Sequence, residues 1–276
     1  MASINLYPAA SNGLTKVWVQ LTTGGAPILP SFYEMFGDPM FSVAMEIWPL
    51  DHPDNFSRLF PSGGYGSHGK GVSSVFGDDP GKGIPSGPAI PKDKPDDYPW
   101  DPSGGQGDPG FDILVLNDQL DWPEDARQNI QKAVQGKKGL VLIHHALGDN
   151  QNWPWWFEKV TGGLCVLDDR NGKKKSTITR PVSLKVELAH EHPILEGVKP
   201  FELADETAYR GMWQSLEITP LLQTTSSGYD QIVAWLGPGS DTRVVCIQPG
   251  SARSTYLNEN FRKLVRNSIL WCAGRM

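Results

Sequence analysis

Hydrophobic residues along this chain come in short runs bounded by polar and glycine-rich turns, which is the pattern of strands buried in a sheet. The runs that we predict as strands are residues 15–21, 41–48, 112–117, 140–143, 182–188, 232–236 and 244–248. A helix is predicted between the third and fourth strands, because Asp121 and Glu124 form a capping pattern and apolar residues follow at helical spacing. A strand, a helix and a strand joined by short links predict a right-handed parallel crossover.

Two further helices are expected in the second half of the chain. An aromatic helix follows Pro154 and stops at Gly162, and a final helix begins after Asn258, a residue type that caps helix N-termini. The apolar residues of the final helix share one face: Phe261, Leu264, Val265, Ile269 and Cys272. These elements predict one α/β domain over residues 1–276, with a mostly parallel open sheet flanked by helices and antiparallel strands added late in the chain.

Residues 61–110 depart from this pattern, because they are rich in glycine and proline and hold few large aliphatic side chains. Such a segment buries too little apolar surface to form part of a core. We therefore expect a surface insertion within the domain, either a flexible excursion or a lid or homo-oligomer contact. Tyr65, His68, Tyr98 and Trp100 would anchor it.

Charge and composition narrow the classes of partner. The 276 residues carry a net charge of −6 and the one basic cluster, residues 173–175, is short, so neither nucleic acid nor a membrane surface is expected as a partner. No apolar run approaches the ~18 residues that span a bilayer, and the N-terminus lacks a signal-peptide pattern. Cys165, Cys246 and Cys272 lack metal-ligand spacing and are expected to be buried free thiols. These features fit a cytoplasmic protein.

Candidate chemistry lies where the strand at 140–143 ends. His144 and His145 follow that strand directly, and ligands of open α/β sheets bind at the carboxyl ends of the strands. Two imidazoles at this place suit acid–base or metal chemistry near neutral pH. Adjacent residues at a strand end point in opposite directions, so one of the two rings is expected to face the ligand.

Two other strand ends are expected to contribute to the same site. Asn117 and Asp118 end the neighbouring strand and are candidates to bind substrate hydroxyl groups, although Asp118 also suits a turn. Gly24 and Gly25 follow the first strand, where the absence of side chains lets the backbone approach a ligand.

Seven segments, in their order along the chain, resemble the ThuA-like family, which is named from trehalose utilisation. They are DILVLND, GLVLIHHA, WPWWFEKVTGG, EHPILEGV, ADETAYRG, IVAW and SILWCAG, within residues 111–274. The resemblance implies a fold similar to that of class I glutamine amidotransferases and a role in carbohydrate metabolism. Those amidotransferases carry a cysteine nucleophile where this chain has His144, so no glutaminase activity is expected. Family members also often carry a histidine where this chain has Ser251, and Arg253 is the candidate to replace it.

The resemblance also selects catalytic candidates. It favours His144 as the ring that faces the ligand, against the alternative of a histidine held by backbone hydrogen bonds in a tight turn. The family's Glu-x-x-Tyr pattern falls on Glu206 and Tyr209, which meet on one face if this segment is helical. Glu206 is then a general base and Tyr209 a proton donor or hydroxyl clamp. The alternative is a capping carboxylate beside a tyrosine of the core.

Metal binding is weakly indicated. His190 and His192 have superficial metal-ligand spacing, but His192 is expected to fix a turn by hydrogen bonding. No histidine pair has the spacing of a zinc-binding helix, so no metal site built by the protein alone is predicted. A divalent ion held by His144, Glu206 and substrate oxygens stays open.

The primary hypothesis is an enzyme that acts on a small carbohydrate or an oxidised sugar by acid–base chemistry: an isomerase, epimerase, lyase or hydrolase. Trp153 is expected to form an apolar wall for the sugar ring, while Trp155 and Trp156 pack in the core. The polar candidates named above would surround the hydroxyl groups. The alternative is a sugar-binding or assembly module without catalysis, which Ser251 and the insertion favour.

Overall fold

A computed structural model describes residues 2–5, 15–23, 41–49, 112–117, 121–122, 124–170, 172–239 and 243–276. The expected insertion at 61–110, and with it Tyr65, His68, Tyr98 and Trp100, lies outside the described residues, as do Gly24, Gly25 and Asp118. The chain forms two compact units. One comprises Met1–Val115 and Trp122–Lys138, and the other comprises Leu116–Asp121 and Gly139–Met276.

The first unit contains three strands and a helix: β1 (Ala2–Asn5), β2 (Thr15–Thr23), β3 (Phe41–Pro49) and α2 (Glu124–Gln135). β3 pairs in parallel with β2 and antiparallel with β1. Val17 and Val19 are buried on β2, and Ile130 and Ala133 form part of the buried stripe of α2. These elements confirm the two strands and the helix that hydrophobic spacing predicts.

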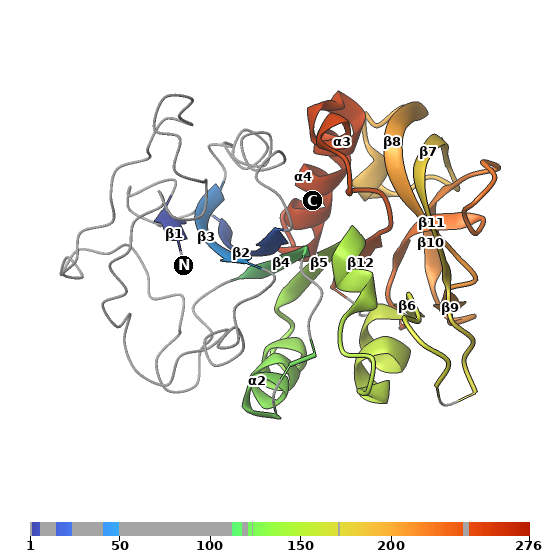
Figure 1. The fold of residues 1–276 in the computed structure, drawn as a ribbon. Coiled ribbons are helices and arrows are strands. Elements are labelled where there is room, and N and C mark those ends of the chain that lie inside the picture. The colour runs from blue at the N-terminus through green and yellow to red at the C-terminus, as the bar shows by residue number, and fades with distance from the viewer. Residues whose placement is uncertain are drawn as a thin grey trace, which may run out of the picture. The chain divides into compact units, whose positions relative to one another are not determined.

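The second unit is built on a sheet of strands in the order β5-β12-β11-β10-β7-β8 (Figure 1). The strands are β5 (Gly139–Ile143), β7 (Thr177–Leu188), β8 (Phe201–Arg210), β10 (Thr219–Gln223), β11 (Ile232–Leu236) and β12 (Val244–Ile247). β12 lies parallel to β5, and Ile247 is the register partner of Ile143. The residues that follow these two strands, Gln248 and His144, therefore begin at the same edge of the sheet.

The expected α/β class is confirmed. The prediction that the sheet is mostly parallel is confirmed only in part. Among the described pairings, β2–β3 and β5–β12 are parallel, and the pairings of β7, β8, β10 and β11 are antiparallel. The connections between strands explain the difference. Antiparallel neighbours can follow one another directly along the chain, whereas a parallel pair needs a longer crossover connection. β10, β11 and β12 follow one another along the chain and are antiparallel neighbours in the sheet, so this part of the sheet is a meander.

Helices of the second unit follow the capping signals in the sequence. The final helix, α4 (Glu259–Cys272), begins after Asn258, whose side chain accepts from the backbone N–H groups of Asn260 and Phe261. Its predicted apolar face is buried, and the helix packs against β5 and β12. α3 (Arg253–Leu257) precedes it. The aromatic helix η4 (Trp155–Thr161) is a π-helix that ends at Gly162, where φ is 66°.

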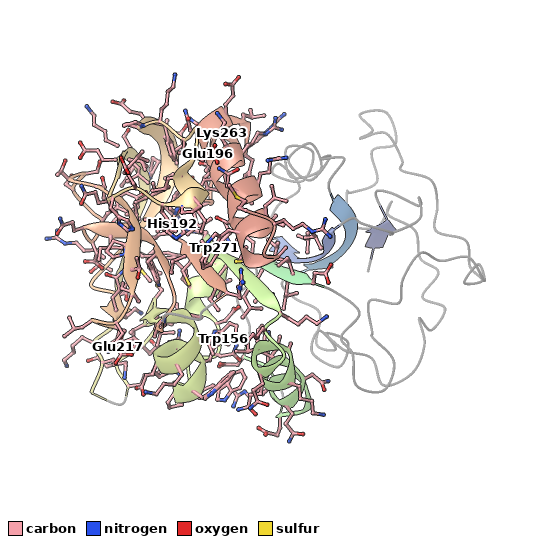
Figure 2. The ribbon with its side chains drawn as sticks, turned by 180° about the vertical axis from the view of Figure 1, so that it is seen from behind. Trp156, His192, Glu196, Glu217, Lys263 and Trp271 are labelled. Carbon is pink, nitrogen blue, oxygen red and sulfur yellow. The ribbon has the colours of Figure 1, made fainter. Side chains whose placement is uncertain are left out.

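Smaller elements complete the second unit. Strand β4 (Ile113–Asn117) contributes its last two residues, Leu116 and Asn117, to this unit. η3 (His144–Gly148) is a 3-10 helix, and β6 (Gly163–Leu164) pairs with β9 (Trp213–Gln214). The 3-10 helix η5 (Pro193–Leu195) follows His192, whose Nδ1 accepts from the backbone N–H of Ile194 at 3.2 Å. The expected role of His192 as a turn-fixing residue is confirmed. Figure 2 shows its ring beside Trp271, with the ring centroids 5.3 Å apart.

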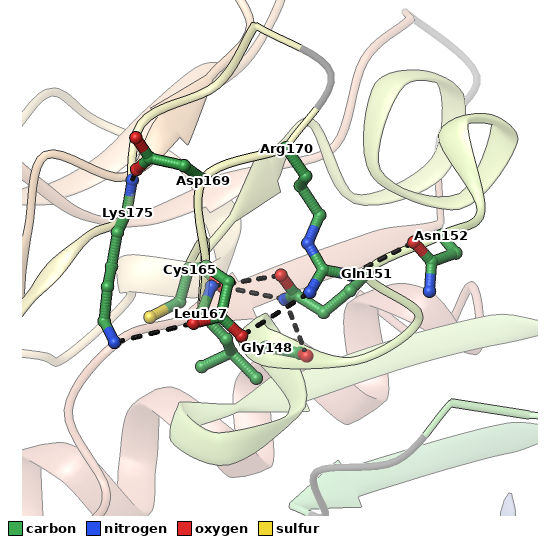
Figure 3. Close-up of polar contacts among 9 residues, drawn as sticks. Gly148, Gln151, Asn152, Cys165, Leu167, Asp169, Arg170 and Lys175 are labelled. Carbon is green, nitrogen blue, oxygen red and sulfur yellow. Dashed lines mark hydrogen bonds and ion pairs between the residues drawn. The ribbon is translucent and has the colours of Figure 1, made fainter.

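The turn after η3 is held by the buried side chain of Gln151. Its Nε2 donates to the carbonyl groups of Gly148 and Cys165, at 2.9 and 2.8 Å. Its Oε1 accepts from the backbone N–H of Leu167 at 3.0 Å, and the three bonds are visible in Figure 3. One side chain therefore ties the segment that carries the two histidines to the chain that follows η4.

The core of the second unit is filled by large side chains, among them Trp156, Trp235 and Phe261. Cys165, Cys246 and Cys272 are free and buried, as the sequence predicts. In the part of the chain that the structure describes, no helix is long and apolar enough to cross a bilayer.

Candidate functional site

His144 is the first residue of η3 and sits in the sharp turn where β5 ends. Its φ is 46°, in the left-handed region that a residue with a Cβ seldom adopts. Such backbone strain persists only where surrounding contacts hold it, and it is concentrated at functional sites. The contacts that hold His144 are described next.

Both ring nitrogens of His144 have partners inside the protein. Nδ1 lies 2.7 Å from the backbone oxygen of Gln248, which can only accept, so Nδ1 carries the proton. Nε2 therefore accepts from the hydroxyl of Tyr209 at 3.0 Å. The two rings stack with centroids 4.5 Å apart. Burial lowers the pKa of His144 to about 4, although the bond to Gln248 raises it in part, so the ring is neutral at physiological pH.

His145 is only half-buried, and its ring is held at one nitrogen. Nδ1 lies 3.1 Å from Asn117 Oδ1 and donates to it, because the Asn117 amide nitrogen donates to the Tyr256 hydroxyl at 2.7 Å. The Tyr256 hydroxyl in turn donates to the carbonyl of Gly250. Among the described residues, Nε2 of His145 has no hydrogen-bond partner.

The electrostatic surroundings of His145 keep its ring neutral. Burial, the neighbouring His144 and the positive charge of Arg180 together lower its pKa to about 3, although the negative charge of Glu206 raises it in part. At physiological pH the Nε2 lone pair of His145 is therefore available to accept a hydrogen bond.

Glu206 is fully buried, and both of its carboxylate oxygens accept hydrogen bonds. Oε2 accepts from the backbone N–H groups of Gly250 and Ser251 and from the Ser251 hydroxyl, at 3.2, 3.2 and 3.0 Å. Oε1 accepts from the backbone N–H of Ala252 and from the Thr255 hydroxyl. Five donors thus fix one carboxylate at the turn between β12 and α3.

The turn that runs from Gln248 to Ser251 is where these hydrogen bonds meet. Its carbonyl groups accept from His144 and from Tyr256, and its N–H groups donate to Glu206. Gly250 has φ 138° there, and a Cβ on it would lie 2.5 Å from Ile143 Cγ2. Glycine is therefore required for the turn to pack against β5.

The helical spacing expected for Glu206 and Tyr209 is wrong, because both lie on strand β8. Residues three apart on a regular strand point to opposite faces. Here Asp205 has φ 61° and the β7–β8 register shifts between Val182 and Leu184 and between Thr179 and Val182, so both side chains are buried. Burial also raises the pKa of Tyr209, which keeps its hydroxyl protonated.

The structure also describes three other residues that the sequence analysis singled out: Trp153, Arg253 and Ser251. Trp153 is buried, and its ring stacks nearly parallel to Trp156 with centroids 5.8 Å apart and lies 5.0 Å from the centroid of Trp155. Arg253 is exposed at the start of α3. Ser251, at the place of the family histidine, is half-buried and bonded to Glu206. The expected role of Trp153 as a sugar-ring wall stays a prediction.

A metal ion held by His144 and Glu206 does not fit this geometry. The nitrogens of His144 and the oxygens of Glu206 already take part in internal hydrogen bonds. Among the described residues, no group of three or more histidine, cysteine, aspartate or glutamate side chains could hold a metal ion. We therefore assign no step to a metal at these two residues.

Sequence reasoning missed Gln248, Gly250, Thr255 and Tyr256, which carry much of the network. The rule that selected His144 could have found the first two, because they follow β12, the parallel neighbour of β5. Thr255 and Tyr256 lie on a five-residue helix with no signal that separates them from ordinary core residues.

The fold and the site define an α/β protein with a buried polar network at the carboxyl edge of its parallel strands. The family model ThuA, described as trehalose utilisation, matches residues 109–272, and the chain belongs to this family. Family membership supports a carbohydrate-related role. No curated protein matches the sequence of the chain.

Solved structures of ThuA-like proteins share the fold. One from Bacteroides uniformis ATCC 8492 is 14% identical, with a TM-score of 0.58 over 96% of this chain and 95% of that chain. One from Parabacteroides merdae ATCC 43184 is 16% identical, with a TM-score of 0.59 over 94% of this chain and 90% of that chain. A glutamine amidotransferase from Thermotoga maritima is 9% identical, with a TM-score of 0.44 over 94% and 98%.

Proposed function

We propose that this chain is a carbohydrate-acting enzyme in which His145 contacts the sugar and transfers a proton. The observation that carries the proposal is Nε2 of His145, at the end of β5, which has no hydrogen-bond partner among the residues that the structure describes. His144, Glu206 and Tyr209 use their polar atoms in bonds within the protein, so they position the turn instead of meeting the substrate.

The hydrogen bonds around His145 suit this role. Asn117 accepts from Nδ1 and so fixes the tautomer that leaves a lone pair on Nε2. Tyr256 and Gly250 hold Asn117 in that orientation. An imidazole fixed in this way loses little conformational entropy when it binds a substrate.

The reaction that this geometry favours is proton transfer next to the carbonyl of an oxidised sugar. Nε2 takes the proton from the carbon beside the carbonyl, the electron pair of the broken C–H bond forms a C=C bond, and the π pair of the carbonyl moves to its oxygen, which gives an enolate. Return of the proton to the former carbonyl carbon, with the proton of the neighbouring hydroxyl group moving to the former carbonyl oxygen, gives an isomer without a further reactant. The imidazolium formed in between is stabilised by Asn117 and by the charge of Glu206.

A second candidate is a sugar-binding protein without catalysis. The lowered pKa of His145, about 3, favours it, because a base this weak accepts a hydrogen bond more readily than a proton. In this case Nε2 contacts a sugar hydroxyl, and the network only orients the ring.

Two substitutions at His145 separate these functions. The side chain in His145→Asn can still donate to Asn117 but places no atom where Nε2 lies, whereas His145→Gln supplies an amide near Nε2 that accepts a hydrogen bond but no proton. Binding of aldoses and oxo-sugars is measured by calorimetry, and chemical change is followed by NMR. His190→Asn, at an exposed histidine, is the control.

We expect the unmodified protein to convert at least one oxidised sugar. His145→Asn should lose binding and turnover, while His145→Gln should retain binding and lose turnover by about 10²–10⁴-fold. Binding without any product would support the second candidate. Turnover that survives in His145→Asn would contradict the proposal.

A further inference from the structure

Arg180 occupies an irregularity of β7 that lies opposite the part of β8 that begins at Glu206. Thr179 pairs with Ala208, but the next pair is Val182 with Glu206, so β7 contains one residue more than β8 in this interval. Such a bulge turns a side chain away from the regular alternation of the strand and is common beside binding sites. Arg180 is thereby placed on the ladder next to the strand segment that carries Glu206 and Thr207.

The guanidinium of Arg180 points to no partner that the described part of the chain supplies. Its residue is exposed, and among the described residues it forms no hydrogen bond or ion pair. Its positive charge nevertheless acts on the His145 ring, where it adds a small part to the lowering of the pKa that burial mainly causes. A cation with no partner and an imidazole lone pair with no partner are therefore within electrostatic range of each other.

A third polar group without a partner belongs to the same region. The turn at Gly228 packs on the bulge, since a Cβ there would lie 3.6 Å from Ala208 Cβ and 3.9 Å from Val182 Cγ1. The next residue, Tyr229, is buried, and its hydroxyl has no hydrogen-bond partner in the part of the chain that the structure describes. The negative charge of Glu206 contributes to raising its pKa, so Tyr229 also lies near the network.

We propose that the ligand of this site is an acidic sugar, a uronate or an aldonate, whose carboxylate binds Arg180 while one of its hydroxyl groups contacts Nε2 of His145. The proposal rests on the proposed function and specifies its substrate class. A guanidinium binds a carboxylate through two parallel N–H···O bonds, which are stronger than bonds between neutral groups. A neutral sugar would leave the cation without a partner, so the site discriminates by charge.

Matched pairs of acidic and neutral sugars test the proposal. The probes are D-glucuronate against D-glucose, D-galacturonate against D-galactose, and D-gluconate against D-glucitol, with binding measured by calorimetry at low and at moderate salt. The variants are Arg180→Gln and, as a control, Lys185→Gln, which removes an exposed cation of the same strand that pairs with Glu202. Circular dichroism checks that each variant folds.

We expect at least one acid to bind about tenfold more tightly than its neutral partner, and this advantage should shrink as salt rises. Arg180→Gln should abolish the advantage, and Lys185→Gln should retain it. Equal affinities for acid and neutral sugar in the unmodified protein, or an advantage that persists in Arg180→Gln, would overturn the proposal. If a neutral sugar binds equally well and depends on His145, the substrate class fails while the proposed function stands; if no sugar binds, both fail.

Discussion

Two neighbouring histidines differ in whether a ring nitrogen is available to bind a ligand. His144 lies in a strained turn, and a carbonyl group and a phenol use both of its ring nitrogens. Among the described residues, His145 has a hydrogen-bond partner at Nδ1 only. The sequence predicts that one of the two rings faces a ligand, but the resemblance alone favoured His144. The choice depends on the carbonyl of Gln248, more than a hundred positions away in the chain. Strand-end reasoning can bring Gln248 to the same edge of the sheet, but it does not show that this carbonyl binds the His144 ring.

The carboxylate of Glu206 is expected to stabilise the fold. Glu206→Gln replaces an anion that five donors surround with an amide that has one acceptor oxygen, so buried N–H and O–H groups lose partners. We expect a loss of about 2–4 kcal/mol in the free energy of unfolding, measured by urea titration. Glu202→Gln, at an exposed ion pair of the same strand, should change it by less than about 1 kcal/mol. Equal effects of the two substitutions would contradict the structural role of Glu206.

Gly250 is expected to tolerate no side chain. Gly250→Ala would place a Cβ 2.5 Å from Ile143 Cγ2 at a φ of 138°, so we expect a loss of about 3 kcal/mol or more. Gly172→Ala is the matched control, because Gly172 also has a positive φ, 74°, but open space around its Cα. Its cost should be about 1–2 kcal/mol. Thermal unfolding of both variants measures the difference, and similar midpoints would contradict the packing described for Gly250.

At the scale of elements, local signals located most of the strands and helices of the described chain. Capping residues and hydrophobic periods predicted α2, α4 and the short buried strands, because these depend on neighbours in sequence. The side chains of Glu206 and Tyr209 would share one face if their segment were helical. Pairing with β7, which no local signal encodes, makes it a strand.

The cap of α4 provides a prediction at this scale. Asn258→Ala removes the oxygen that accepts from the N–H groups of Asn260 and Phe261. We expect the free energy of unfolding to fall by about 1 kcal/mol, while Asn258→Ser should retain most of it. Urea titration of both variants measures the effect. A serine variant as unstable as the alanine variant would contradict capping by this side chain.

At the scale of the whole molecule, the buried histidines make stability depend on pH. Burial lowers the pKa of His144 to about 4 and that of His145 to about 3, and it also lowers the pKa of His192, whereas an unfolded chain binds these protons near pH 6.5. The unfolded state therefore binds more protons below pH 6.5, and stability falls as pH decreases toward 4 and 3. Each of His144 and His145 contributes up to about 1.4 kcal/mol per pH unit in this window.

Urea midpoints at pH 7.5 and pH 5 measure this dependence. We expect a lower midpoint at pH 5 and a weaker dependence on pH in His145→Gln. A midpoint that is equal at both pH values would show that these rings are not neutral and buried together in the folded protein.

The central claim is that His145 Nε2, and not His144, meets the sugar. Long-range proton–nitrogen NMR of the imidazole rings tests it directly during titration with the acidic and neutral sugars. We predict that both rings are neutral with the proton on Nδ1, and that addition of a binding sugar shifts the Nε2 signal of His145 while that of His144 stays in place. A shift at His144 Nε2 with none at His145, for a sugar that binds, would contradict the account.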